Sequence, residues 1–278
     1  MVNPAIGKIL AVLKPVHEAE IFANRLFKIL DMPTPHFAII DKSHFNKSIN
    51  DTVEASLHTS AAASDKRMVM EPVLGRAMSE YNAEELKNLL LNEENLELLG
   101  RCMVFDTFTG NADRIVPFSA NIINPDNIMF QDGSVTFIDQ ASKPRSSQII
   151  RIFTKMASVV QPDPGLQNNS TNVYDTYTLR LVERSLQKYE QKTLKHERDL
   201  AIENHSFEKF KSLIDTNHKV KINLLLTAGI CNGVQKLMSK KEKILEECGE
   251  NEHMKKAINE IYAGLVGLSV IFKEIKSS

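Results

Sequence analysis

The sequence predicts an α+β protein in which a small, strand-bearing N-terminal part precedes a mainly helical C-terminal part. Short apolar runs bounded by proline and charged residues occupy the first 75 residues, whereas apolar residues at helical spacing dominate after residue 146. Between them lies a loop-rich stretch, residues 111–142, that is dense in Asp and Asn. We therefore divide the chain into an N-terminal lobe at 1–75 and a C-terminal lobe at 76–278.

The N-terminal lobe is predicted to hold strands at 8–13, 36–40 and 68–71, and a helix at 17–30. The helix is indicated by apolar residues that recur every three to four positions: Ile21, Phe22, Leu26, Ile29 and Leu30. Residues 41–67 are rich in small and polar side chains and poor in large apolar ones. We expect a mobile insertion there.

The C-terminal lobe begins with helical periodicity between Asn82 and Gly110, which predicts two helices, or one interrupted helix, closing at Gly110. The dipeptide Asp132-Gly133 lies between the apolar runs 128–130 and 135–138, and this pattern predicts a tight β-hairpin. Further helices are expected after the loop region, at 146–158, 172–198, 206–214, 219–238 and 253–275.

Composition excludes several classes of protein. The formal net charge is -1, so the chain as a whole does not favour binding to nucleic acid. The longest apolar stretches, at 222–230 and 263–272, fall short of the roughly 18 residues that a membrane span needs. The three cysteines have no metal-ligand spacing and the eight histidines form no helical pair, so zinc is not expected. We expect a soluble cytoplasmic protein with reduced cysteines.

The loop-rich stretch carries the candidate chemistry. Asp113, Asn127 and Asp139 lie in loops or at the ends of short strands, where catalytic groups are commonly found. Carboxylate and amide oxygens are hard donors that suit Mg²⁺ or Mn²⁺. Phosphoryl transfer needs such metal ligands, a carboxylate near the attacking hydroxyl and a cation on the nucleotide phosphates.

The motifs Asn111-Ala112-Asp113-Arg114, Asn127-Ile128-Met129-Phe130 and Phe137-Ile138-Asp139-Gln140 resemble the catalytic core of the actin-fragmin kinase family, a group of atypical protein kinases. They are similar, more distantly, to phosphatidylinositol kinases. The resemblance covers about residues 10–142, and it extends to a Legionella-type bacterial effector kinase of this group. It implies a protein-kinase-like, two-lobed fold with a reduced N-terminal β lobe and a mainly helical C-terminal lobe.

The resemblance also implies roles for individual residues. Asp113 would be the catalytic carboxylate that orients or deprotonates the acceptor hydroxyl. Asn127 and Asp139 would hold the Mg²⁺ or Mn²⁺ ions that bridge the phosphates of ATP. Lys14 would contact the α- and β-phosphates, and Glu20 would fix Lys14 by an ion pair.

The adenine-binding hinge would consist of Met70, Glu71 and Val73. Glu18 is an alternative partner for Lys14. One departure from the family concerns the turn that covers the phosphates: Gly7 is the sole glycine before Lys14, so a Gly-rich loop is absent or rudimentary. A second departure is Gln140, which stands where ordinary kinases have the Phe of their activation switch.

Two further aspartates lie close to the motifs. Asp106 falls within the apolar helix pattern before Gly110, and we expect it to have a structural role, bonding the backbone of the catalytic loop. Asp126 precedes Asn127 and is an alternative metal ligand. The pair Asp113-Arg114 could also be a surface ion pair without function.

A basic stripe follows the predicted helix 172–198. Its members recur every three to four residues: Arg180, Arg184, Lys188, Lys192 and Lys195. One interpretation is a solvated helix face. The other is a site for a polyanion such as an inositol phosphate or an acidic lipid headgroup.

These observations predict ATP-dependent phosphoryl transfer to a hydroxyl, with Ser or Thr of a protein substrate as the expected acceptor. The alternatives are a nucleotide-binding, pseudokinase-like regulatory module, and a lipid kinase or another ATP-using transferase. The expected location is the cytoplasm, or the host-cell cytoplasm if the chain is a secreted bacterial effector.

Overall fold

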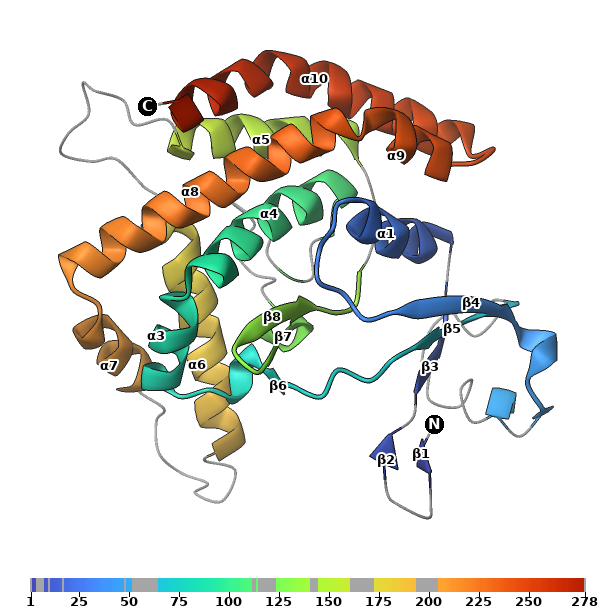
Figure 1. Cartoon of the computed structure of the whole chain (residues 1–278), viewed down its shortest axis with the longest axis horizontal. Helices are drawn as coiled ribbons and strands as arrows, with labels where there is room; N and C mark the ends of the chain where they lie inside the picture. Colours follow the sequence, from blue (N-terminus) through green and yellow to red (C-terminus); the bar gives the residue numbers. More distant parts are fainter. Residues whose placement is uncertain are drawn as a thin grey trace.

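The computed structural model describes residues 2–3, 8–9, 11–16, 18–47, 49–51, 65–111, 114, 124–140, 145–160, 173–193 and 205–277. Over these residues the α+β class is confirmed: helices dominate, and the strands form small antiparallel sheets. Figure 1 shows the strands at one end of the molecule and the long C-terminal helices at the other.

The N-terminal part contains one three-stranded sheet in the order β3-β5-β4, with β5 antiparallel to both neighbours. A separate two-stranded pair, β1-β2, precedes it. The elements are β1 (Val2–Asn3), β2 (Lys8–Ile9), β3 (Val12–Pro15), α1 (Glu18–Ile29), β4 (Phe37–Asp41), the 3-10 turn η1 (Lys42–His44) and β5 (Lys66–Met70).

Two boundaries in this part differ from prediction. The strand expected at 8–13 is two strands, β2 and β3, that belong to different sheets. β5 begins at Lys66, so the last two residues of the predicted insertion 41–67 lie in a strand. Lys66 and Arg67 pair with Asp41 and Ile40 at the start of β5, the central strand of the sheet, where backbone pairing outweighs the low strand propensity of a charged residue. Residues 52–64 of that insertion lie outside the described residues.

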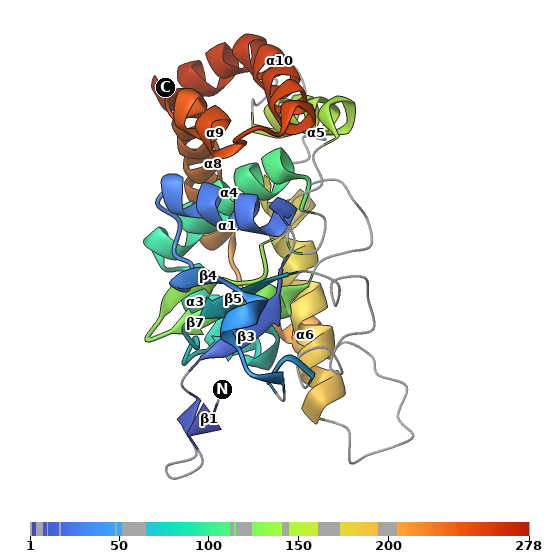
Figure 2. The same cartoon turned by 90° about the vertical axis from the view of Figure 1, so that its right-hand side faces the viewer.

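Helix α1 belongs to two apolar clusters at once. Ile21 packs with Val16 and Met68 beneath the small sheet. The helix also contributes Phe22, Leu26 and Phe27 to the main core, and Leu30 directly after the helix belongs to the same core. Figure 2 shows α1 and α4 between the small sheet and the C-terminal helices. The predicted boundary at residue 75 separates the β3-β5-β4 sheet from the β6-β7-β8 sheet. It does not separate the apolar clusters, because α1 contributes residues to both of them.

The middle of the chain confirms the two-helix alternative and the hairpin. Its elements are β6 (Arg76–Ala77), the 3-10 turn η3 (Met78–Glu80), α3 (Ala83–Leu90), α4 (Glu93–Thr109), the 3-10 turn η4 (Pro125–Asn127), β7 (Ile128–Gln131) and β8 (Ser134–Phe137). Gly110 ends α4 in the left-handed region at φ 68°, as the capping signal predicts. Asp132 and Gly133 turn the hairpin with φ of 51° and 82°, as a two-residue turn of the Asp-Gly type requires.

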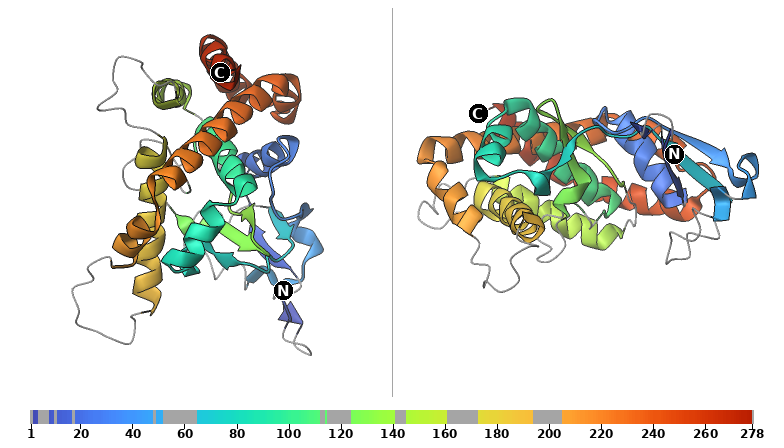
Figure 3. Two further views of the ribbon diagram at one scale, coloured as in Figure 1. Left: turned by 60° about the vertical axis from the view of Figure 1, so that its left-hand side comes forward. Right: turned by 90° about the horizontal axis from the view of Figure 1, so that it is seen from below.

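The C-terminal helices are α5 (Ser146–Val160), a π-helical turn η5 (Tyr174–Thr178), α6 (Leu179–Thr193), α7 (His205–Leu213), α8 (Thr216–Ser239), α9 (Lys241–Glu247) and α10 (Glu252–Ser277). Helix α9 is absent from the sequence prediction, since its single buried residue, Ile244, gives no periodic pattern. Both views of Figure 3 show α6 on the outside of the molecule. In the left view α6 lies on one side of the β6-β7-β8 sheet, and β4 and β5 lie on the other. In the described part of the chain no helix combines the length and apolarity needed to cross a membrane.

Helices α4 and α8 cross at very short range. A Cβ atom added to Gly100 of α4 would overlap the backbone oxygen of Leu226, and one added to Gly229 of α8 would overlap that of Glu97. The two backbones approach so closely because each helix has a glycine at the crossing point. Gly267 of α10, in contrast, has no atom within 4 Å of the position its Cβ would take.

This crossing yields a stability prediction. Gly229→Ala should lower the free energy of unfolding by about 1–3 kcal/mol, because the added methyl group forces two backbones apart. Gly267→Ala should raise it by about 0.5–1 kcal/mol, since only the helix propensity changes there. Chemical denaturation of both variants measures the difference. Equal effects of the two substitutions would contradict the close crossing.

Candidate active site

Lys14 joins parts of the chain that are far apart in sequence. Its ammonium group donates a hydrogen bond to Oδ1 of Asp139 at 2.8 Å and forms an ion pair with Oε1 of Glu20. Lys14 lies on β3 and Glu20 in the first turn of α1, while Asp139 follows β8. The structure therefore brings together three of the residues that the sequence predicts for the site.

The alternative partner of Lys14 is engaged elsewhere. Glu18, the first residue of α1, accepts a hydrogen bond from Lys66 of β5 at 2.6 Å. Glu20, not Glu18, is thus the helix carboxylate beside Lys14. Of the two lysines, only Lys14 also bonds Asp139 within the described part of the chain.

Burial and charge act on Lys14 in opposite directions. Desolvation favours its neutral form, but the carboxylates of Asp139 and then Glu20 outweigh that effect, so the pKa of Lys14 is raised above its ordinary value. The ammonium is therefore charged throughout the physiological range. It is partly exposed, at 26% of its side chain, and the carboxylate of Asp139 is half exposed.

Asp139 has a backbone conformation that few residues adopt. Its φ of 57° lies in the left-handed region, which Asp tolerates better than most non-glycine residues. The neighbours of Asp139 are fixed by Arg114: the carbonyl oxygen of Ile138 and the side chain of Gln140 both accept hydrogen bonds from it, at 2.8 and 2.6 Å. The amide of Gln140 in turn donates to the carbonyl of Phe137 at 2.8 Å. These bonds hold the residues on either side of Asp139.

Arg114 is fully buried and forms a two-pronged ion pair with Asp106. Its Nε and Nη2 donate to the two carboxylate oxygens at 2.9 and 2.6 Å, and both side chains have no exposed surface. Burial alone would lower the pKa of Arg114, but Asp106 raises it well above its ordinary value. The surface-pair interpretation of this arginine is therefore wrong.

Asp106 receives further donors from its surroundings. The amide of Asn111 donates to Oδ1 at 3.1 Å and the thiol of Cys102 donates to Oδ2 at 3.4 Å. Burial raises the pKa of that thiol well above its usual value. The structural role predicted for Asp106 is confirmed: its carboxylate bonds the side chains of Asn111 and Arg114, and its backbone carbonyl accepts from the backbone N–H of Asn111.

Asn127 is joined by a backbone hydrogen bond to Ile138, the residue before Asp139. Its carbonyl accepts from the N–H of Ile138 at 3.1 Å, and its own N–H donates to the carbonyl of Asn124 at 3.1 Å. The residue is 6% exposed. The two predicted metal ligands, Asn127 and Asp139, thus lie at the two ends of the β7-β8 hairpin, at the same edge of the sheet.

Asp126, the alternative metal ligand, points elsewhere. It accepts hydrogen bonds from Lys188 at 2.7 Å, from Lys192 at 3.2 Å and from the hydroxyl of Ser79. Burial would raise the pKa of Asp126, but these donors, Lys188 first, lower it to about 2. The carboxylate is therefore ionised and bound to cations of the protein itself.

The remaining predicted residues fall into two groups. Asp113 lies outside the described residues. Met70, Glu71 and Val73 stand where the chain leaves β5 for β6, with Met70 paired to both neighbouring strands. Glu71 is anchored twice to His36, through its backbone N–H and its carboxylate, each at 3.0 Å.

The basic stripe does not form one face. Arg180 and Arg184 are exposed, whereas Lys188 and Lys192 turn toward Asp126. An α-helix has 3.6 residues per turn, so a four-residue repeat rotates by about 40° at each step. Two steps from Arg180 carry Lys188, and three steps carry Lys192, to the edge of the buried face. The polyanion site at Arg180, Arg184, Lys188 and Lys192 stays a prediction.

Two features of the described residues bear on bound groups. Among these residues no cluster of three or more His, Cys, Asp or Glu side chains is arranged to hold a metal. Asn127 and Asp139 nevertheless stand where β7 begins and after β8 ends, at the open end of one hairpin, and their side chains carry the oxygen types that Mg²⁺ and Mn²⁺ prefer. A hollow lined by Asp41, Phe45 and Asn50 lies on the segment after β4 and contains none of the predicted residues.

Sequence reasoning missed the residues that hold the site together. Arg114 was considered only as the neighbour of Asp113, and Gln140 only as a departure from the family. The sequence did contain an indication of this network. Asp106 falls inside an apolar helix pattern, and Arg114 and Gln140 lie in the two loops that follow. A buried carboxylate requires a partner, and these are the groups that could reach it.

The buried pair yields a second prediction. Asp106→Asn and Arg114→Met should each lower the free energy of unfolding by about 3–5 kcal/mol, since each leaves one charge buried without a counter-charge. The double variant contains neither charge, so its loss should be clearly smaller than the sum of the two single losses. Denaturant unfolding of the wild type and the three variants gives the coupling free energy. Additive losses would show that the two side chains do not depend on each other.

The comparisons with known proteins yielded no family: no protein-family model and no curated protein matches the chain. The site is therefore defined by its own geometry, in which Lys14 joins Glu20 to Asp139 and Arg114 holds the residues around Asp139.

Proposed function

We propose that the chain is an ATP-dependent kinase that transfers the γ-phosphoryl group of ATP to a hydroxyl, with Ser or Thr of a protein as the acceptor. The observation that carries the proposal is the pairing of one charged lysine with carboxylates from two distant elements, Glu20 of α1 and Asp139 after β8. A lysine fixed by a helix glutamate beside a loop aspartate is the arrangement that phosphoryl transfer in kinases requires.

Lys14 suits the role of a phosphate-binding cation. Its raised pKa keeps it charged, and an ammonium group has three donors, so it can bond a phosphate oxygen while Glu20 keeps its position. Part of the side chain is exposed, which leaves room for an anion to approach. Asp139 and a phosphate both offer anionic oxygens, so the same ammonium can serve both.

Asn127 and Asp139 would hold Mg²⁺ or Mn²⁺ through their side-chain oxygens. When bound, such an ion neutralises charge on the β- and γ-phosphates. The chain's own contribution is to keep the two residues at one sheet edge, through the bond between Ile138 N–H and the carbonyl of Asn127. The hydrogen bonds from Arg114 to both neighbours of Asp139 limit the movement of that carboxylate.

The acceptor hydroxyl would attack the γ-phosphorus as the bond to the β,γ-bridging oxygen breaks and ADP leaves. Its proton would pass to the carboxylate of Asp113, and this role rests on the resemblance of the Asp113-Arg114 motif. The same resemblance supports adenine binding at Met70, Glu71 and Val73, a protein substrate, and a cytoplasmic setting, that of the host cell for a secreted effector.

The proposal is tested by binding and by transfer. Wild-type protein is titrated with Mg²⁺·ATP and Mn²⁺·ATP by calorimetry, and is then incubated with γ-labelled or α-labelled ATP and either casein or phosphatidylinositol vesicles. Transfer of the γ-label to protein is expected. Lys14→Met and Asp139→Asn should each reduce it by about 100-fold or more, because each removes a charge that acts on the phosphates.

Lys66→Met is the matched control. Lys66 pairs with a glutamate of the same helix α1 but does not reach Asp139, so this variant should stay within about twofold of the wild type. Label in the lipid would replace the protein acceptor by a lipid, and α-label transfer would indicate another ATP-using transferase. Nucleotide binding without transfer to any acceptor would favour the regulatory module. No nucleotide binding, or binding that Lys14→Met leaves unchanged, would refute the proposal.

A further inference from the structure

Helix α6 carries two lysines whose ammonium groups donate hydrogen bonds to the same carboxylate. Lys188 and Lys192 are four residues apart, so their side chains leave the helix on neighbouring positions. Both lie at the edge of the face that buries Leu181 and Ser185. Their ammonium groups thus point toward the rest of the protein, where they meet the turns η3 and η4.

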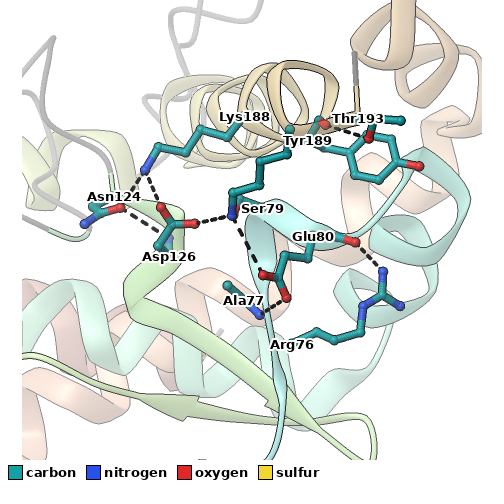
Figure 4. Close-up of polar contacts among 10 residues, drawn as sticks. Arg76, Ala77, Ser79, Glu80, Asn124, Asp126, Lys188, Tyr189 and Thr193 are labelled. Carbon is teal, nitrogen blue, oxygen red and sulfur yellow. Dashed lines mark hydrogen bonds and ion pairs between the residues drawn. The ribbon is translucent and has the colours of Figure 1, made fainter. Parts of the chain in front are cut away.

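Asp126 of η4 is the common acceptor. The ammonium of Lys188 donates to Oδ2 of Asp126 at 2.7 Å and to Oδ1 of Asn124 at 2.8 Å. That of Lys192 donates to Oδ1 of Asp126 at 3.2 Å and to the hydroxyl of Ser79 at 2.8 Å. Figure 4 shows Lys188 reaching from α6 to both Asn124 and Asp126.

The turn that these lysines hold is short and contains a predicted metal ligand. η4 consists of Pro125, Asp126 and Asn127, and it leads directly into β7. Asn124 accepts from the N–H of Asp126 at 3.3 Å, so Lys188 bonds both Asp126, the middle residue of the turn, and Asn124, the residue that precedes the turn. A displacement of Asp126 in a turn of this length also displaces Asn127.

We infer that Lys188 and Lys192 are positioning residues for the metal-binding half of the site: by holding Asp126, they set the position of Asn127. The inference rests on the proposed function, in which Asn127 is a ligand of Mg²⁺ or Mn²⁺. Residues that orient a metal ligand without touching the metal typically change its affinity 10- to 100-fold when they are replaced.

Three properties distinguish this arrangement from an ordinary surface ion pair. Two cations converge on one carboxylate, whereas a single exposed pair contributes little. The side chain of Lys188 is 22% exposed, which limits screening by water. The bonds also join three elements, α6, η3 and η4, because Ser79 donates to Asp126 as well.

The test measures metal binding directly. Calorimetry or electron paramagnetic resonance gives the Mn²⁺ affinity of the full chain in the presence of a non-hydrolysable ATP analogue. Lys188→Met and Lys192→Met should each weaken Mn²⁺ binding by about 10-fold or more. Affinity for the analogue without metal should stay within about twofold. Lys188→Arg keeps the charge and should recover most of the Mn²⁺ affinity.

Lys209→Met is the matched control for loss of an interhelical lysine pair. Lys209 of α7 bonds Glu84 of α3 at 2.9 Å, and neither residue touches η4, so Mn²⁺ affinity should not change. Thermal unfolding of every variant accompanies the binding data. A loss of Mn²⁺ affinity that Lys209→Met reproduces, or that is matched by an equal loss of metal-free nucleotide binding, reflects stability alone and would overturn the inference.

Substitution of the ligands separates failure of the inference from failure of the function. If Asn127→Ala and Asp139→Ala abolish Mn²⁺ binding while Lys188→Met and Lys192→Met leave it intact, the positioning role is wrong and the proposed function stands. If Asn127→Ala and Asp139→Ala do not affect Mn²⁺ binding, the proposed metal site fails, and the positioning role fails with it.

Discussion

The guanidinium group of Arg114 lies completely inside the protein, and removing it from water requires compensation from every side. Asp106 supplies the counter-charge, while Ile138 and Gln140 both accept hydrogen bonds from Nη1. The ring of Phe27 lies 5.0 Å from the guanidinium carbon and contributes an aromatic face. Because these partners come from α1, α4 and the segment after β8, the arginine can be satisfied only when all three are in their final places.

Helix α4 is the common support of the two carboxylates that bind Lys14. Asp139 is connected to it through Arg114 and Asp106. Glu20 is connected to it through the body of α1, whose Phe27 packs edge-on against Phe105 at 6.1 Å. The end of α1 is also tied to α8, since Asp31 bonds Lys236 at 2.8 Å.

Local signals predicted the elements well, whereas tertiary contacts were predicted only where a family resemblance supplied them. Gly110 and Asp132-Gly133 were identifiable because capping and turn geometry depend on adjacent residues. The pairing of Lys14 with Glu20 followed from the resemblance. Arg114 could not be recognised as buried, because burial depends on partners distant in sequence. The contacts of Lys188 and Lys192 with Asp126 were not predicted, because they join segments that are distant in sequence.

The embedding of α1 in the main core has a thermodynamic consequence for any ligand of Lys14. Glu20 stands on a helix packed into that core, and the neighbours of Asp139 are bonded to Arg114, so both carboxylates are ordered as the chain folds. The ammonium that they share is ordered with them. The conformational entropy of these three side chains is thus lost during folding and not on association. An anion that reaches this lysine meets a preorganised group, and more of the interaction energy then appears as affinity.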